Sequence, residues 1–115
     1  MEWRVELHDA FVIEFEQLTE EVQDELLAQV RLLEVFGHRL GRPHVDTLKG
    51  SSYPNMKELR FNTKDGVWRV AFAFDPKRCA ILLVAGDKSG ISQKQFYKNL
   101  IRKADQRFYE HLANL

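Results

Sequence analysis

The chain has 115 residues, of which 44% are hydrophobic and 30% are charged. This composition is ordinary for one soluble globular domain spanning residues 1–115. No apolar run approaches the ~18 residues of a membrane-spanning helix, and the first residues resemble no secretion signal, so we expect a cytoplasmic protein. The single cysteine, Cys79, excludes an internal disulfide. It lacks the histidine partner of a nucleophilic thiol, so we expect it to pack in the core.

The formal net charge is zero, but the charges are separated along the sequence. Residues 1–36 contain ten acidic and two basic residues, a net charge of −8, whereas residues 37–115 contain fifteen basic and seven acidic residues, a net charge of +8. Such a separation creates a field across the molecule. It predicts a basic functional surface and an acidic surface on the opposite side of the molecule. The simpler alternative is that two helices are merely rich in glutamate on their solvent sides.

The first third of the chain predicts a strand and two helices. Residues 2–7 alternate charged and apolar side chains, as a half-buried strand does. Asp9 is a good N-cap for a short helix, and apolar residues follow it at helical spacing: Phe11, Phe15 and Leu18. Thr19 can cap a second helix, which Gly37 is placed to end. We expect these helices to form an antiparallel hairpin on the apolar face of a sheet.

The remaining two thirds predict a loop, three strands and a last helix. Residues 37–55 form a long basic loop with no sustained periodicity, and long ordered loops are often functional. Residues 56–90 contain three strands joined by turns at Asn62–Gly66 and Asp75–Arg78. Helical spacing returns over residues 91–113. The order β-α-α-β-β-β-α predicts an α+β fold, with an antiparallel sheet, an N-terminal helical hairpin on one face and a C-terminal helix.

The register of the first hairpin can be argued from its side chains. If Leu59 lies opposite Val70, all bulky apolar residues share one face, and Arg60 then lies directly opposite Arg69 on the other face. Facing like charges destabilise a ladder by roughly 0.2–1 kcal/mol. The pair therefore indicates room for an anion. The alternative is two solvated arginines on an exposed sheet face.

The second hairpin is predicted from a four-residue loop. Phe74 would then lie opposite Cys79 and Phe72 opposite Ile81. The face of the two arginines would gain four further residues: Ala80, Leu82, Val84 and Lys88. A change of one residue in the loop would exchange the two faces.

After the common catalytic and cofactor motifs are excluded, the remaining candidate site residues are cationic and aromatic. The sequence has no glycine-rich phosphate loop, no dinucleotide fingerprint, no metal-ligand spacing and no Ser/His/Asp order, so we expect no cofactor and no metal. What remains are Lys49, Lys57, Arg60, Arg69 and Lys88, with Tyr53 and Tyr97 nearby in sequence. Cations for phosphate and rings for bases are typical of RNA-handling sites. Such a site can cleave RNA without metal, because cations stabilise the transition state and the ribose hydroxyl is the nucleophile. Strand parity turns Lys57 toward the core side, so we rank it below the arginines.

Four segments together resemble a known family. They are Gly41–Gly50, Asn55–Arg60, Trp68–Pro76 and Gly86–Lys88. The combination is similar to the phage-derived, HigB-like branch of the RelE/ParE toxin superfamily, and the resemblance extends over nearly the whole chain, including Ala104-Asp105 and His111-Leu112 near its end.

This resemblance implies the toxin of a type II toxin–antitoxin pair, a ribosome-dependent endonuclease that cleaves mRNA and stops translation. Its implied partners are the ribosome with its mRNA and a helix-turn-helix, HigA-like antitoxin, through which alone it would reach operator DNA. The resemblance assigns Arg60 and Arg69 to the phosphate, and Lys88 to transition-state charge or leaving-group protonation. Tyr97 and His44 are candidates for removing the ribose proton or binding RNA, each with a structural role as the alternative.

Two other functions remain open on the sequence alone. ParE-like relatives share the fold but bind DNA gyrase and are not nucleases. A phage-derived module that only binds nucleic acid would show RNA affinity that falls with salt, but no turnover.

Overall fold

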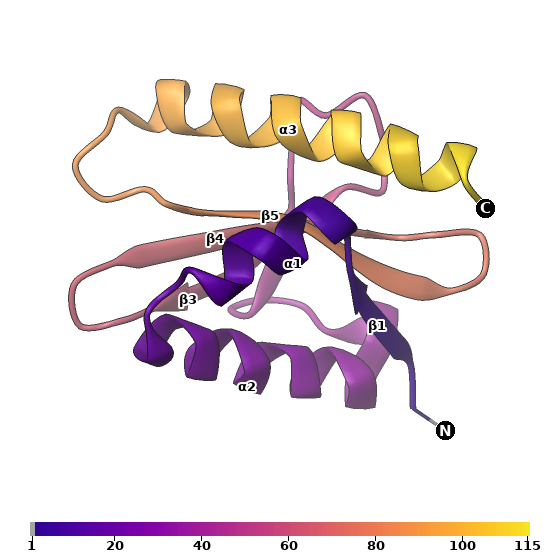
Figure 1. Cartoon of the computed structure of the whole chain (residues 1–115), viewed down its shortest axis with the longest axis horizontal. Coiled ribbons are helices and arrows are strands. Elements are labelled where there is room, and N and C mark those ends of the chain that lie inside the picture. Colours follow the sequence, from indigo (N-terminus) through magenta and orange to yellow (C-terminus); the bar gives the residue numbers. More distant parts are fainter. Residues whose placement is uncertain (1) are drawn as a thin grey trace.

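The computed structural model describes residues 2–115. The elements in chain order are β1 (Arg4–Leu7), α1 (Asp9–Glu16), α2 (Glu20–Phe36), the 3₁₀ turn η1 (Gly37–Arg39), β2 (Val45–Thr47), β3 (Lys57–Asn62), β4 (Val67–Phe74), β5 (Cys79–Asp87) and α3 (Gln93–Ala113). The five strands form one sheet in the order β1-β5-β4-β3-β2. Figure 1 shows α3 on one side of this sheet and α2 on the other.

The predicted α+β order is confirmed, with two differences in the sheet. The neighbours among β2 to β5 are antiparallel, but β1 pairs in parallel with β5, so the sheet is mixed. The predicted loop also contains β2, a three-residue strand at the edge of the sheet. The segment Val45–Thr47 is too short for alternation to be visible in the sequence, so only its pairing with β3 defines it as a strand.

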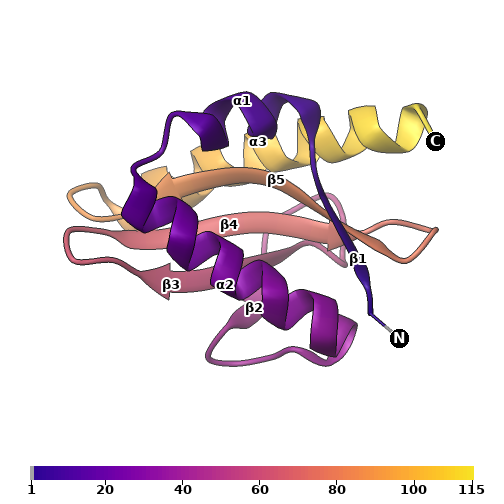
Figure 2. The ribbon, with the colours of Figure 1, turned by 60° about the horizontal axis from the view of Figure 1, so that its bottom comes forward.

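The helix ends follow local capping chemistry. His8 caps α1, because its Nδ1 accepts a hydrogen bond from the N–H of Ala10, so the prediction of Asp9 as the cap was wrong by one residue. Thr19 caps α2 and Gly37 ends it with a positive φ of 59°, both as predicted. Helices α1 and α2 run in roughly opposite directions, as Figures 1 and 2 show, so the expected hairpin is confirmed.

Each face of the sheet has its own core. On one face the α3 side chains Phe96, Leu100, Ala104 and Phe108 pack against Ala71, Ala73, Ile81 and Leu83. On the other face Phe11, Val22, Leu26 and Leu33 of α1 and α2 pack against Leu59, Val70, Phe72 and Leu82. Cys79 is buried in the α3 core, as expected, and burial raises the pKa of its thiol to about 12.

The register of the first hairpin is confirmed in full. Leu59 lies opposite Val70, Phe61 opposite Trp68, and Arg60 opposite Arg69. Leu59 and Val70 belong to the core under α1 and α2. Because side chains alternate along a strand, Arg60 and Arg69 both lie on the α3 side of the sheet.

The register of the second hairpin was predicted one residue out. Phe74 lies opposite Ala80, and Ala73 opposite Ile81. Arg78 has a φ of 65°, and its N–H donates to the carbonyl of Asp75, so the loop has the three-residue form that ends in a left-handed residue. Ala80 and Leu82 therefore lie in the core under α1 and α2, contrary to prediction.

A β-bulge at Leu83 returns the strand to the predicted phase. Phe72 lies opposite Leu82 but Ala71 opposite Val84, which leaves Leu83 as the extra residue. Leu83 and Val84 both pack in the α3 core. Val84 therefore shares the face of the arginines, as predicted, and by alternation so does Lys88.

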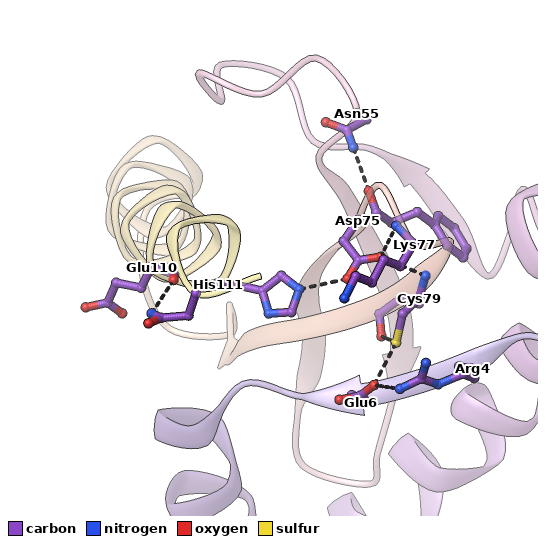
Figure 3. A network of polar contacts seen from close by, with 11 residues as sticks. Arg4, Glu6, Asn55, Asp75, Lys77, Cys79, Glu110 and His111 are labelled. Atoms are coloured by element: carbon purple, nitrogen blue, oxygen red, sulfur yellow. Dashed lines mark hydrogen bonds and ion pairs between the residues drawn. The ribbon is translucent and has the colours of Figure 1, made fainter.

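Polar contacts fix the β4–β5 turn and the end of α3, as Figure 3 shows. Oδ1 of the buried Asp75 accepts from the N–H groups of Lys77 and Cys79, and its Oδ2 lies 2.8 Å from His111 Nε2. One turn earlier in α3, Arg107 donates to Glu14 of α1 and to the carbonyl of Leu83. Within residues 2–115, no helix combines the length and apolarity needed to cross a bilayer.

Candidate functional site

Four parts of the chain line a depression of about 410 Å³ on the α3 side of the sheet. Its charged and aromatic lining includes Lys49 after β2, Glu58 and Arg60 on β3, Lys88 after β5, and Tyr97 near the start of α3. The structure thus brings together four of the residues predicted from the sequence, Lys49, Arg60, Lys88 and Tyr97. Glu58 was not predicted.

The two opposed arginines differ in exposure. The Arg60 side chain is 34% exposed, whereas that of Arg69 is 7% exposed. Arg69 Nη1 donates to the carbonyl of Trp68, and its Nε lies 3.9 Å from Glu58 Oε1. The expectation of two guanidinium groups on one open surface is therefore corrected. Only Arg60 reaches solvent freely, and Arg69 supplies positive charge from beneath it.

Both arginines nevertheless keep an unused donor. Arg60 Nε and Arg69 Nε are buried and have no hydrogen-bond partner within residues 2–115. A buried N–H without an acceptor costs about 1–3 kcal/mol. The distance of 3.9 Å to Glu58 is too long to relieve this cost at Arg69. An anion lying over β3 and β4 would supply the missing acceptors once the two side chains turn toward it.

The exposed end of Arg60 is held by an acidic neighbour. Asp46 Oδ2 lies 3.8 Å from Arg60 Nη1 and 3.1 Å from Arg42 Nη2. A hydrogen bond from the N–H of Thr47, followed by that from Arg42, lowers the pKa of Asp46. A phosphate that binds Arg60 has to replace this ionised carboxylate as its partner.

Glu58 and Tyr97 form a hydrogen-bonded pair in the depression. The Tyr97 hydroxyl donates to Glu58 Oε1 over 2.9 Å, and the Glu58 side chain is 8% exposed. Burial raises the pKa of Glu58, although Tyr97 and Arg69 oppose the shift. Burial and the bond to Glu58 raise the pKa of Tyr97. Glu58 could have been found from the sequence, because alternation along β3 places it on the same face as Arg60.

Lys88 completes this group from the end of β5. Its Nζ lies 5.8 Å from the centre of the Tyr97 ring, within the range of a cation–π contact. Burial, followed by the positive charges of Arg69 and Arg60, lowers the pKa of Lys88. A lysine in this environment gives up its proton more readily than a free lysine.

The other candidate residues lie elsewhere. His44 lines a neighbouring depression beside α2, together with Arg69 and with Arg60, which lines both depressions. Lys57 alternates with Leu59 on β3, so it lies on the opposite face from Arg60, and it lines neither depression. Tyr53 packs edge-on against Phe108 of α3 and is part of the core margin.

Comparison with solved structures defines the class of fold. The chain superposes on a mutant of E. coli toxin RelE in the free state with a TM-score of 0.59 and 10% identity, covering 90% of this chain and 97% of that one. It superposes on a chain of the archaeal RelE–RelB complex from Pyrococcus horikoshii with a TM-score of 0.56 and 19% identity, covering 78% of this chain and 99% of that one. The protein has the RelE-like fold.

Comparison of sequences defines the family. Residues 13–109 match the family "Phage derived protein Gp49-like (DUF891)", and the chain belongs to it. Two relatives come from Mycobacterium tuberculosis. "Putative toxin HigB2" is 45% identical over 97 residues, 84% of this chain. "Putative toxin HigB3" is 44% identical over 100 residues, 87% of this chain and 85% of that protein. The alignment spans only 48% of the length of HigB2.

Proposed function

We propose that this protein is the toxin of a type II toxin–antitoxin pair and cleaves mRNA on the ribosome. The similarity to HigB2 and HigB3 and the RelE-like fold support the toxin class. The observation that carries the nuclease proposal is the pair of opposed arginines whose buried Nε–H groups lack acceptors within residues 2–115. A phosphodiester is an anion that would supply these acceptors.

In the proposed mechanism, the scissile phosphate lies against Arg60. Glu58 takes the proton of the ribose 2′-hydroxyl, and O2′ attacks the phosphorus as the bond to O5′ breaks. The products are a 2′,3′-cyclic phosphate and a 5′-hydroxyl. Arg69 stabilises the added negative charge of the transition state from within the sheet. Its burial keeps it at a fixed place, which favours this role over direct capture of RNA.

The perturbed pKa values support the two proton-transfer roles. The raised pKa of Glu58 makes its carboxylate a stronger base, and the lowered pKa of Lys88 makes its ammonium a better acid toward O5′. Tyr97 orients Glu58 through their hydrogen bond and keeps its own proton, because its pKa is raised. Glu58 therefore replaces Tyr97 and His44 as the preferred base.

The proposed partners follow from the family. We expect neutralisation by an antitoxin, in line with the RelE–RelB complex of the Pyrococcus relative, and we keep the prediction that this antitoxin is a HigA-like helix-turn-helix protein. Lys49, which lines the same depression, is proposed to hold a flanking phosphate. Lys57 has no place in this arrangement and stays a prediction from the sequence.

The test is cleavage of a defined mRNA on purified ribosomes, with the new 5′ ends mapped by primer extension. We compare the wild type with Arg60→Ala, Lys88→Ala and Glu58→Gln, and use Arg102→Ala as control because Arg102 is an exposed arginine of α3 that lines neither depression. Loss of a positioned acid or base costs about 10²–10⁴-fold in rate. We expect losses of this size at Glu58 and Lys88, and none at Arg102.

Two outcomes would contradict the proposal. Full cleavage by a folded Arg60→Ala, Arg69→Ala double variant would remove the arginines from the mechanism. Intact mRNA together with inhibited DNA supercoiling would favour the ParE-like function, and salt-sensitive RNA binding without any product would favour the binding-only module.

A further inference from the structure

A second depression of about 440 Å³ lies beside the first, at the free part of the edge of β3. Among its lining residues are Gln29 of α2, His44, and Arg60, Phe61 and Asn62 of β3, with Arg69 of β4. Arg60 lines both depressions. Strand β2 begins at Val45, opposite Leu59, so within residues 2–115 no strand pairs with this edge of Phe61 and Asn62.

The backbone of Asn62 presents a free hydrogen-bonding edge. The N–H of Lys88 donates to the carbonyl of Val67, and the N–H of Val67 donates to Asp87, so the backbone groups of Val67 point toward β5. Val67 lies opposite Asn62 in the antiparallel pair. The N–H and C=O of Asn62 therefore point away from β4, toward the unpaired edge.

The polar side of the depression is held by a buried amide. His44 Nδ1–H donates to Gln29 Oε1 over 3.2 Å, and Gln29 is only 9% exposed. Gln29 Nε2 and His44 Nε2 are not among the buried atoms without a partner in the described part of the chain, which are Arg60 Nε and Arg69 Nε, so they remain open to solvent and to a ligand. A helix seldom turns a polar amide inward unless its groups are used. The depression thus offers donors and acceptors at fixed positions.

The buried guanidinium group of Arg69 adds an unpaired donor to the lining of the second depression. Its side chain is 7% exposed and its Nε has no partner among residues 2–115. Guanidinium planes stack on bases, and RNA is read in single-stranded form through its base edges. An extended strand whose phosphate rests on Arg60 would carry the adjacent base into this space.

We infer that the second depression binds the nucleobase next to the scissile phosphate, read by the Gln29–His44 pair and the free edge of Asn62. This inference rests on the proposed function, since it assigns the phosphate to Arg60. It adds a base subsite on the α2 side of the arginines, away from Lys88 and Tyr97.

The test is an NMR titration of the ¹⁵N-labelled full chain with the four nucleoside 5′-monophosphates, using ribose 5-phosphate as the matched probe without a base. We expect at least one nucleotide to shift the amide signals of His44, Phe61 and Asn62 and the side-chain amide of Gln29. Ribose 5-phosphate should shift only signals around Arg60, Lys88 and Tyr97.

Two variants then test whether Gln29 contacts the base. Gln29→Met removes the hydrogen-bonding groups at similar size, and Gln29→Leu removes them with a branched side chain; both are uncharged, so the charge around Arg60 and Arg69 stays the same. Each should weaken nucleotide binding about three- to tenfold while leaving ribose 5-phosphate binding unchanged, and an amide spectrum unchanged outside the depression verifies the fold.

Equal shifts from nucleotides and ribose 5-phosphate, or base-dependent shifts only near Lys49 and Tyr97, would overturn the inference. So would an unchanged nucleotide affinity in both folded variants. These outcomes are separable from failure of the proposed function. A wild type that cleaves mRNA but shows no base-dependent shift at Asn62 refutes only the base subsite. One that shows this shift but never cleaves refutes only the nuclease.

Discussion

Gly37 is the position where a single added methyl group should harm this fold most. It ends α2 with φ 59° and ψ −136°, and its N–H donates to the carbonyl of Leu33. A Cβ atom built there would lie inside the van der Waals radius of the Trp3 ring. That ring cannot easily move, because it contacts His38 and Phe74 edge-on and carries the Arg78 guanidinium at 4.5 Å from its centre. Gly37→Ala therefore combines backbone strain with overpacking.

The size of the effect follows from these two terms. A non-glycine residue in such a backbone conformation costs about 1–3 kcal/mol, and overpacking costs about another 1–3 kcal/mol. For 115 residues, the unfolding entropy of ~2.1 cal/mol/K per residue sums to about 0.24 kcal/mol/K. A loss of about 2–6 kcal/mol should thus lower Tm by about 8–25 °C.

Substitutions at two other glycines distinguish backbone strain from overpacking in a thermal melt followed by circular dichroism. Gly90 has a φ of 76° and open space around its Cβ position, so Gly90→Ala tests backbone strain alone, at about 1–2 kcal/mol. Gly41 has neither a left-handed φ nor an atom within 4 Å of that position, so Gly41→Ala should stay within about 0.5 kcal/mol of the wild type. If Gly37→Ala melts together with Gly90→Ala, the clash with Trp3 has no energetic weight and the reasoning is refuted.

Three further predictions concern the site and the core. Tyr97→Phe keeps the ring beside Lys88 but leaves Glu58 without its donor, so it should lower the free energy of unfolding by about 1–3 kcal/mol and slow cleavage, while RNA affinity measured by filter binding stays constant. The raised pKa of Glu58 means that its contribution to stability is complete below the unfolded value of 4.5 and is lost as pH rises through the folded pKa. The stability of Glu58→Gln relative to wild type, from urea unfolding, should therefore increase from pH 4 to pH 7, and a decrease would contradict the assignment. Cys79, 2% exposed and with a pKa of about 12, should resist iodoacetamide at pH 8 in the folded protein but not in urea, as measured by mass spectrometry; rapid labelling of the native protein would show that the strand opens.

The first hairpin could be predicted from the sequence and the second could not, for reasons of turn geometry. The first turn ends in Gly66, and its register places all large apolar residues on one face. The second turn uses Arg78 in a left-handed conformation, which glycine or asparagine would have signalled and arginine does not. The bulge at Leu83 has no local signature either, since Leu82, Leu83 and Val84 are equally apolar. Lys88 lies on the predicted face of the sheet only because two errors cancel. The unexpected turn exchanged the faces of β5, and the extra residue Leu83 exchanged them back.

The candidate site, like the two hairpins, could be predicted only in part from the sequence. Alternation along β3 and β4 was enough to place Arg60 and Arg69 on one face, but their different burial depends on contacts across the sheet that no local pattern encodes. Glu58 lies in the same alternation and was overlooked because a single acid in a strand usually faces solvent. Its hydrogen bond with Tyr97, which lies 39 residues later in the sequence on α3, forms only in the folded chain.

The pairing of β1 with β5 has a consequence for how the chain is made. Arg4 is aligned with Cys79, so β1 has to wait for β5, the last strand of this sheet, before it gains its neighbour. The acidic helical hairpin leaves the ribosome early, while Lys88 and α3 leave at the end. A growing chain therefore cannot assemble the first depression until the segment from Lys88 to Tyr97 has also left the ribosome.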